Sequence, residues 1–365
     1  MTNTFARASM TVGSMQPVVV PFGTLPDGTA VEQFTMTNAN GVEVSFLSLG
    51  GIITRVVVPD RDGQFADITP GYDTLDHYLA DTRYFGALVG RYANRIADAR
   101  FVLDGVEHQL SRNDGRNQLH GGPNGFHRVV WTVVPFATTA GTGAMLRHTF
   151  AAGSDGYPGV LDVIVTYTLT DENELVIDYA ATTDAPTPVN MTQHVYFNLA
   201  GQDAGDIFDH ELTLHASRYL PVDANVIPTG DIASVRDTEF DFTAPRPIRL
   251  ADADGKATEY DNTFVIDSAD PRRAIAVLHD PRSGRTIEVM TTEPGIQLYT
   301  GKYIGTGQHG KSGHHYLANS ALALETQHFP NSPNEPRFPS TILRPGEEFR
   351  SSTTYRFSAS DSLTV

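Results

Sequence analysis

The sequence predicts an all-β protein built mainly from antiparallel strands. Asp-Gly and Asn-Gly pairs, which favour tight turns, recur from the first fifty residues to beyond residue 250. Between these turns lie short segments rich in β-branched and aromatic residues, whereas helical periodicity is scarce. Short strands separated by frequent turns are typical of an antiparallel sandwich or barrel.

Five segments carry the strand pattern most clearly: Val42–Leu49, Ile52–Val58, Phe101–Leu103, Val160–Leu169 and Leu175–Ala181. In the fourth segment, Val163, Val165 and Tyr167 fall on one face of the strand. The residues between them, which include two threonines, fall on the other face. One face of that strand is therefore expected to be buried. The pattern of a short helix is found at Thr74–Leu79 and at little else.

Nothing in the chain marks a domain boundary. Its 365 residues contain no low-complexity linker, no repeat of fixed period and no sharp change of composition. We therefore expect one large domain over residues 21–365, preceded by a loosely held N-terminal segment over residues 1–20.

Charge and composition exclude several classes of function. The formal net charge is -17, and the chain has no Lys/Arg-rich run, which argues against nucleic acid and anionic membranes as partners. No apolar run approaches the roughly 18 residues of a membrane span, and the N-terminus lacks the apolar core of a signal peptide. The expected location is the cytoplasm. The absence of cysteine excludes disulfides, thiolate nucleophiles and Cys-ligated zinc.

The segment Ala321–Asn331 places an ionisable group in a strand that otherwise has a buried pattern. Small and apolar residues alternate from Ala321, and Glu325 interrupts the pattern before Phe329-Pro330-Asn331 ends the strand. A lone buried charge is costly unless it is paired or its pKa rises. Taken alone, Glu325 fits a structural hydrogen-bonded pair at least as well as a catalytic group.

Two further segments combine polar side chains with glycine. Tyr84–Ile96 contains Arg91, Asn94 and Arg95, which suit either a solvated surface or a clamp for hydroxyl or carboxylate groups. His120 precedes Gly121-Gly122, a turn that permits close backbone approach. Both segments leave a structural and a functional role open.

The segment Asn190–Gly201 predicts a strand with one polar face. Thr192, His194, Tyr196 and Asn198 share that face, and mainly apolar residues share the other. Solvent-facing strands usually carry Lys, Glu, Ser or Thr. The row is therefore compatible with a cleft wall as well as with the surface.

Three later segments contribute further candidates. Asp261 lies in Tyr260–Phe264, where capping a turn is the simpler role, and Gln297 shares a strand face with Tyr299. A Gly-rich stretch contains three histidines whose spacing matches no standard zinc pattern: His309, His314 and His315.

Together these segments resemble the aldose 1-epimerase (galactose mutarotase) family. The matching motifs are GRYANRI at Gly90–Ile96, NQLHGG at Asn117–Gly122, TQHVYFNLAG at Thr192–Gly201, YDNTF at Tyr260–Phe264, GIQLYTG at Gly295–Gly301 and ALETQHFPNSPN at Ala323–Asn334. They occur in the family's order and extend from about residue 80 to the end. The resemblance implies one large antiparallel β-sandwich of the galactose mutarotase-like type.

The resemblance also implies roles for individual residues. By motif, Glu325 matches the family's general base, His194 its general acid, and His120 a second histidine near the sugar's ring oxygen. The residues that match those holding sugar hydroxyls are Asn94, Arg95, Asp261 and Gln297. One departure is Asn262, where many members have His, and we expect it to affect only packing behind the site.

The implied reaction interconverts the α and β anomers of a free aldohexose such as galactose or glucose. It needs a base for the anomeric hydroxyl and an acid for the ring oxygen, which a carboxylate and an imidazole supply near neutral pH. We therefore expect no redox cofactor, no metal and no partner beyond a sugar, in a monomer or homodimer. The alternatives are a hexose-phosphate mutarotase or epimerase, a glycoside hydrolase, which normally needs two carboxylates, and a non-catalytic sugar-binding module.

Overall fold

The computed structural model of the chain describes residues 15–249, 258–268, 270–305 and 309–361. Within them the all-β prediction is confirmed, because the strands pair antiparallel throughout and the one α-helix is α1 (Leu75–Ala80). This helix lies where the sequence predicts it, with Thr74 at its N-cap. Of the N-terminal segment expected to be loosely held, residues 1–14 lie outside the described residues, and residues 18–20 belong to the first strand.

Three large sheets carry most of the strands, and two-stranded pairs complete the fold. The five-stranded sheet has the order β1 (Val18–Thr24), β2 (Ala30–Thr37), β3 (Glu43–Leu47), β4 (Ile53–Pro59), β5 (Phe65–Asp67). The nine-stranded sheet has the order β11 (Thr132–Thr138), β12 (Gly141–Phe150), β13 (Leu161–Leu169), β14 (Glu174–Thr183), β28 (Phe349–Ala359), β24 (Arg285–Thr291), β23 (Ala276–His279), β18 (Glu211–Leu214), β21 (Arg246–Pro247). The six-stranded sheet has the order β17 (Tyr196–Phe197), β26 (Leu322–Gln327), β25 (Gly295–Tyr299), β22 (Asp261–Val265), β19 (Arg218–Tyr219), β20 (Ala233–Ser234).

The remaining elements are short and lie mostly in the connections. The two-stranded pairs are β10 (Gln118–Leu119) with β7 (Arg95–Ile96), β15 (Thr187–Pro188) with β27 (Ile342–Leu343), β16 (Thr192–His194) with β6 (Ala87–Val89), and β8 (Arg100–Leu103) with β9 (Val106–Gln109). The 3-10 turns are η1 (Ala97–Ala99), η2 (Phe126–Arg128), η3 (Ser154–Gly156), η4 (Lys311–Gly313) and η5 (Ser332–Asn334).

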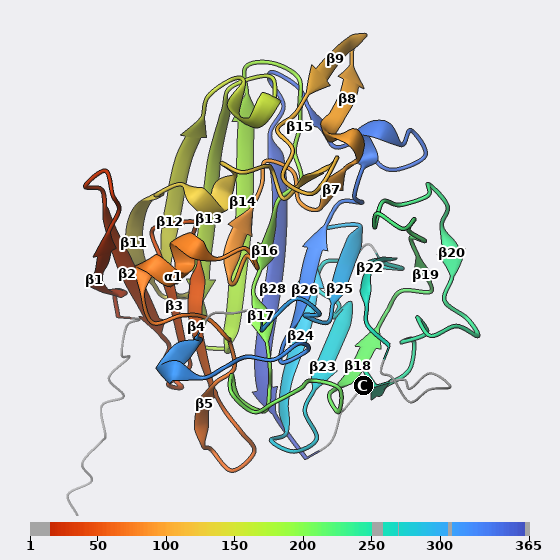
Figure 1. Cartoon of the computed structure of the whole chain (residues 1–365). Helices are drawn as coiled ribbons and strands as arrows, with labels where there is room; N and C mark the ends of the chain where they lie inside the picture. Colours follow the sequence, from red (N-terminus) through yellow and green to blue (C-terminus); the bar gives the residue numbers. More distant parts are fainter. Residues whose placement is uncertain (1–14, 250–257, 269, 306–308, 362–365) are drawn as a thin grey trace, which may run out of the picture.

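The main hydrophobic core lies between two layers of strands (Figure 1). The nine-stranded sheet forms one layer, and the five- and six-stranded sheets pack against it. Two buried tyrosines of the nine-stranded sheet cross the interface, since Tyr167 donates to the Gly51 carbonyl and Tyr355 to the Leu324 carbonyl. In the strand β13, buried residues alternate with half-buried or exposed ones, as its sequence predicts.

One predicted strand is divided in the structure. The stretch expected to run through Asn190–Gly201 consists of β16, which pairs with β6, and β17, which pairs with β26. The expectation of one continuous strand was wrong because Val195 stands between segments that pair with different partners. The two halves thereby connect the strands around β6 to the six-stranded sheet.

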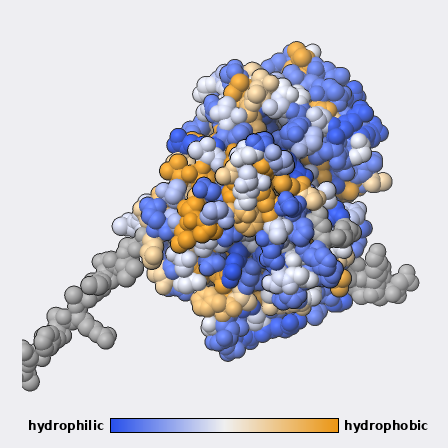
Figure 2. Space-filling model, turned by 60° about the vertical axis from the view of Figure 1, so that its left-hand side comes forward, coloured by the Kyte–Doolittle hydropathy of each residue, from blue (hydrophilic) through white to orange (hydrophobic). Residues whose placement is uncertain are grey.

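The surface is largely hydrophilic, as the acidic composition indicates. Figure 2 shows the side that lies on the left of Figure 1, where hydrophobic residues gather toward the middle of a mostly hydrophilic face. Three exposed valines, Val18 to Val20, lie on β1, the edge strand of the five-stranded sheet. Among the described residues, no helix has the length and apolar character needed to cross a membrane.

Gly86 lies where three backbone segments meet beside the polar pocket described below. Its carbonyl accepts from Ile53 N–H at 2.7 Å, and its own N–H donates to the His194 carbonyl at 3.1 Å. Its φ is +63°, and a Cβ at this position would overlap the Ile53 carbonyl. Both the conformation and the close approach require glycine.

We expect Gly86→Ala to lower the free energy of unfolding by roughly 3 kcal/mol or more, because backbone strain and a clash with a fixed carbonyl add together. The matched control is Gly63→Ala, where φ is +78° but nothing lies within 4 Å of the added Cβ. The control has only the left-handed φ to accommodate, at about 1–2 kcal/mol. Urea unfolding of the three proteins measures the difference. Equal losses for both variants would contradict the packing argument.

Candidate active site

Glu325 lies in the interior of the six-stranded sheet, between β17 and β25. Every residue of β26 is buried. Leu322 and Leu324 face the main core, whereas Ala323 belongs to a second hydrophobic cluster on the opposite face, the face that Glu325 shares. The strand ends at Gln327, before the predicted Phe329-Pro330-Asn331 segment. The sheet therefore holds a carboxylate at a fixed position on its outer face.

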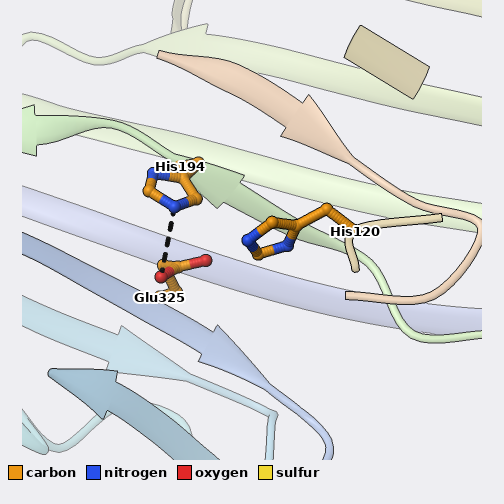
Figure 3. Close-up of side chains that lie close together, drawn as sticks. All are labelled: His120, His194 and Glu325. Atoms are coloured by element: carbon orange, nitrogen blue, oxygen red, sulfur yellow. Dashed lines mark ion pairs between the residues drawn. The ribbon is translucent and has the colours of Figure 1, made fainter. Parts of the chain in front are cut away.

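His194 reaches Glu325 from the end of β16. Its Nε2 lies 3.6 Å from Glu325 Oε1, and both side chains are at most 5% exposed (Figure 3). The following residues enter β17, which pairs directly with β26 through Tyr196 and Ala323. The change of pairing partner at Val195 thus sets His194 beside the carboxylate.

His120 approaches the same two groups from the turn after β10. Its ring centroid lies 5.2 Å from that of His194, and Figure 3 shows the three side chains converging. The His120 N–H donates to the Asn94 carbonyl at 3.1 Å, and the Asn94 N–H donates to His120 Nδ1 at 3.2 Å. These two bonds fix both the backbone and the ring of His120.

The three side chains line one pocket that is open to solvent. About 530 Å³ of empty space lies within it, including solvent space at its mouth. The lining residues are Thr82, Arg83, Tyr84, Asn94, Arg95, Leu119, His120, His194, Tyr196, Asp261, Tyr299, Tyr303 and Glu325. Six of the seven residues to which the family resemblance gives a role are therefore in the wall.

The seventh residue, Gln297, lies behind the wall. It stands opposite Glu325 across the β25–β26 ladder. Its Nε2 donates to Asp261 Oδ1 at 2.7 Å, and its Oε1 accepts from the Thr263 hydroxyl at 2.5 Å. Gln297 therefore orients Asp261 in this structure.

Arg95 is held between two carboxylates. Its Nε donates to Asp114 Oδ2 at 2.8 Å, and its Nη1 lies 4.0 Å from Asp261 Oδ2. Asn94 Oδ1 accepts the Arg95 backbone N–H at 2.8 Å. Asp114 was not identified from the sequence, where Asp114-Gly115 has only the pattern of a turn.

Several other residues that the sequence suggested for the site lie outside the pocket. Arg91 is buried, and its Nη1 donates to the carbonyls of Pro158 and Gly159, away from the pocket. In the polar row of Asn190–Gly201, only His194 and Tyr196 reach the pocket. Thr192 is buried outside it, and Asn198 Nδ2 donates to the carbonyls of two other loops, so half of that row is not a cleft wall.

The three histidines of the Gly-rich stretch also lie away from the pocket. His314 Nε2 lies 3.1 Å from Asp203 Oδ2, and the rings of His309 and His315 are 4.1 Å apart.

Sequence reasoning gave no role to two tyrosines of the pocket wall, Tyr84 and Tyr303. The Tyr84 ring stacks on His194 at 5.9 Å between centroids and contacts the edge of His120 at 4.6 Å. Tyr299 and Tyr303 line another part of the pocket. Single tyrosines in a β-rich chain carry no signal of their own, although Tyr84 stands just before the Arg-Asn motif.

Burial dominates the electrostatics of the site. It lowers the pKa of His194 to about 4 and holds the pKa of His120 well below its usual range. It also raises the pKa of Glu325 well above 4.5, and the nearby Asp261 carboxylate adds to the rise. Each group is thus favoured in its neutral form.

The same three side chains also carry atoms that can ligate a metal ion. Ligand atoms of His120, His194 and Glu325 lie within 4.8 Å of one another. Two imidazoles and a carboxylate are a donor set for zinc or iron. Whether each imidazole nitrogen is available depends on its hydrogen bonds.

The fold and the pocket together define the class of protein. It is an all-β protein whose small-molecule pocket is equipped for acid–base chemistry. An antiparallel β scaffold carries a buried carboxylate and two neutral imidazoles in a pocket rimmed by Asn, Arg and Asp. The chain belongs to the aldose 1-epimerase family, whose model, Aldose 1-epimerase, matches residues 32–356.

Comparison with individual proteins gives the same family. The chain is 43% identical to galactose mutarotase of Bos taurus over 337 residues, which cover 92% of this chain and 97% of the relative. It is 37% identical to aldose 1-epimerase of Escherichia coli (strain K12) over 341 residues, with the same coverage. Among solved structures, the GalM/aldose epimerase homologue from C. elegans superimposes with a TM-score of 0.83 at 34% identity, covering 89% of this chain and 98% of that one.

We expect Glu325→Gln to be more stable than the wild type at pH 8, with the difference vanishing near pH 4. Because the folded-state pKa of Glu325 is raised, its contribution is neutral below about 4.5 and becomes destabilising as pH rises. A tenfold difference in proton affinity between the folded and unfolded states is worth about 1.4 kcal/mol. Urea unfolding at several pH values measures the difference between the two proteins. A variant less stable than the wild type at pH 8 would show that the carboxylate is stabilised as an ion.

Proposed function

We propose that this protein interconverts the α and β anomers of a free aldohexose such as galactose or glucose, without a metal or redox cofactor. The observation that carries the proposal is the 3.6 Å approach of Glu325 and His194 in one pocket, in a chain of the aldose 1-epimerase family. We further propose a cytoplasmic role in hexose metabolism, in the location that the sequence favours.

The proposed reaction opens and recloses the sugar ring. Glu325 accepts the proton of the anomeric hydroxyl, and the anomeric carbon–ring oxygen bond breaks as His194 protonates the ring oxygen. The free aldehyde rotates about its bond to the neighbouring carbon. On closure the two side chains exchange roles, and the ring oxygen attacks the other face of the carbonyl.

The proposed cycle alternates between two protonation forms of the pair. Ring opening moves one proton onto Glu325 and removes one from His194, so the pair always holds a single proton. Burial favours the form with a protonated Glu325 and a neutral His194. That form is the one the pair has when the open-chain aldehyde is bound.

The remaining polar residues suit neutral hydroxyl groups. Asn94 both donates and accepts hydrogen bonds, Arg95 donates, and the Asp261 carboxylate accepts. Gln297 supports this role by orienting Asp261. Tyr196 and Tyr299 line the same pocket and offer aromatic surface for the apolar face of a sugar ring.

A hexose-phosphate substrate is the second candidate, because Arg83 also lines the pocket. A phosphate dianion normally needs several donors. Arg95 is already engaged by Asp114, and Arg91 lies elsewhere. A non-catalytic sugar-binding module is disfavoured because binding alone needs no paired carboxylate and imidazole.

We expect Glu325→Gln to lower turnover about 100- to 10,000-fold, because the change keeps the shape and removes the proton acceptor. Polarimetry of freshly dissolved α-galactose and α-glucose measures turnover. The matched control is Glu293→Gln, a buried carboxyl that pairs with His328 outside the pocket, and it should retain activity. A folded Glu325→Gln protein with near-wild-type turnover would place the base elsewhere.

We expect a higher catalytic efficiency on galactose or glucose than on glucose 6-phosphate, because the pocket offers few donors for a dianion. Anomerisation rates for the three sugars, at matched concentrations, measure this. A clear preference for the phosphate that disappears in Arg83→Gln would promote the second candidate.

A further inference from the structure

The loop that joins α1 to β6 carries part of the pocket wall, including Arg83 and Tyr84. It begins at Asp81, the C-cap of α1, which is buried. One carboxylate oxygen of Asp81 accepts the Arg83 backbone N–H at 2.9 Å, and the other accepts the Phe85 backbone N–H at 3.0 Å. The carboxylate therefore binds the backbone on both sides of Tyr84.

Tyr84 has a left-handed backbone conformation, with φ at +57°. Four other turns share this arrangement: a side-chain oxygen accepts the N–H groups two and four residues later, and the residue three later has a positive φ. These turns begin at Asn38, Asp60, Thr170 and Asp223. Their left-handed residues are Gly41, Gly63, Asn173 and Val226. Glycine and asparagine adopt this conformation readily, whereas a tyrosine must be held in it.

The turn at Asp81 lacks the backbone closure of the other four. In each of those, the N–H of the first residue donates to the carbonyl of the fifth, and the N–H of the fourth donates to the carbonyl of the first. Within the described part of the chain, no backbone hydrogen bond joins Asp81 to Tyr84 or Phe85. The Asp81 carboxylate is therefore the contact that closes this turn.

Asp81 is itself fixed by its surroundings. Its N–H donates to the Tyr78 carbonyl, and its carbonyl accepts from Arg128 Nη2 at 3.0 Å. Its Oδ1 also accepts the hydroxyl of the buried Tyr72 at 3.1 Å. The carboxylate thus gives the loop a rigid anchor at the end of α1.

The Tyr84 ring packs against the histidines of the site. Its centroid lies 5.9 Å from that of His194, with 26° between the planes, and 4.6 Å from that of His120. His194 Nδ1 is buried without a hydrogen-bond partner from another described residue, and its Nε2 lies 3.6 Å from Glu325 Oε1. The orientation of the His194 ring therefore depends on the rings packed around it, and Tyr84 is stacked on it.

From this arrangement we infer that Asp81 is a positioning residue of the site. Its carboxylate holds Tyr84 in the left-handed conformation, and the Tyr84 ring holds His194 in line with Glu325. The inference rests on the proposed function for the catalytic role of His194. The link from Asp81 through Tyr84 to His194 is independent of the substrate.

The inference predicts an effect on turnover rather than on substrate binding. The residues that suit sugar hydroxyls are held by other contacts, because Asp114 binds Arg95 and Gln297 binds Asp261. A displaced Tyr84 ring would misalign the acid and the base and leave these contacts in place.

Kinetics of Asp81→Ala separate the two effects. We expect kcat on galactose to fall roughly 10- to 100-fold, because small misalignments of catalytic groups cost about that much. We expect KM to stay within about threefold of the wild-type value, because the groups that bind hydroxyls are unchanged. A folded Asp81→Ala protein with the wild-type kcat, or with a raised KM alone, would overturn the inference.

Asp81→Asn is the milder change and serves if Asp81→Ala does not fold. The carboxylate uses both oxygens, whereas an asparagine has one and would set its own N–H against that of Arg83 or Phe85. We expect its kcat to lie between those of the wild type and Asp81→Ala. The matched control is Asp223→Asn, because one oxygen of Asp223 accepts both N–H groups of its exposed turn. Its kcat should stay within about twofold of the wild type, and an equal kcat for the two asparagine variants would contradict the inference.

NMR of the histidine rings tests the link without any activity measurement. The ring signals of His194, assigned by their absence in His194→Gln, report on the stacked Tyr84 because an aromatic ring shifts the resonances of nearby nuclei. We expect these signals to move in Asp81→Asn and to stay in place in Asp223→Asn. Unchanged His194 signals in folded Asp81→Asn would refute the link. If the wild type turned over no aldose, the proposed function would fail, while the NMR comparison would still decide whether Asp81 holds Tyr84 against His194.

Discussion

The burial of the Glu325 carboxyl is the constraint on which the site depends. A carboxylate in the interior of a sheet is unfavourable unless its neighbours accommodate it. In this structure the neighbour in direct reach is an imidazole that burial keeps neutral, and the guanidinium of Arg95 is occupied by Asp114. The pair therefore shares a proton at the wall of the pocket. A reactive carboxyl and a stable β scaffold are compatible because only one residue of β26 carries this cost.

Antiparallel strand pairing places further residues of the pocket beside Glu325. Tyr196 stands opposite Ala323 on one side of β26, and Gln297 stands opposite Glu325 on the other. One strand further, Asp261 stands opposite Tyr299. Because side chains of neighbouring strands at matched register share a face, strand pairing brings Tyr196, Tyr299 and Asp261 into the pocket wall beside Glu325. It also sets Gln297 behind Asp261, which it orients. The loops add His120, Asn94 and the Tyr84 ring from the opposite side.

The sequence predicts most of the architecture and only part of the site. Turn signals and alternation were sufficient for the all-β class. The carboxyl in an apolar strand drew attention to Glu325, but only the family resemblance gave it a catalytic role. The motif order supplied His120 and Asp261, which local pattern alone left undecided. The division of the stretch around Val195, the withdrawal of Gln297 behind Asp261 and the Asp114 contact to Arg95 were missed. Each of these depends on which strand lies next to which, and a local pattern contains no such information.

The change of pairing partner at Val195 has a consequence for how the chain acquires its site. His194 is placed by β6, and Glu325 by a strand more than a hundred residues later in the chain. Contacts between distant segments form slowly, because loop closure must precede them. The two groups meet only after the early strands and the C-terminal strands have both docked. The pocket is therefore complete only when both segments are docked, and a chain with native strands but an undocked C-terminal segment would lack it.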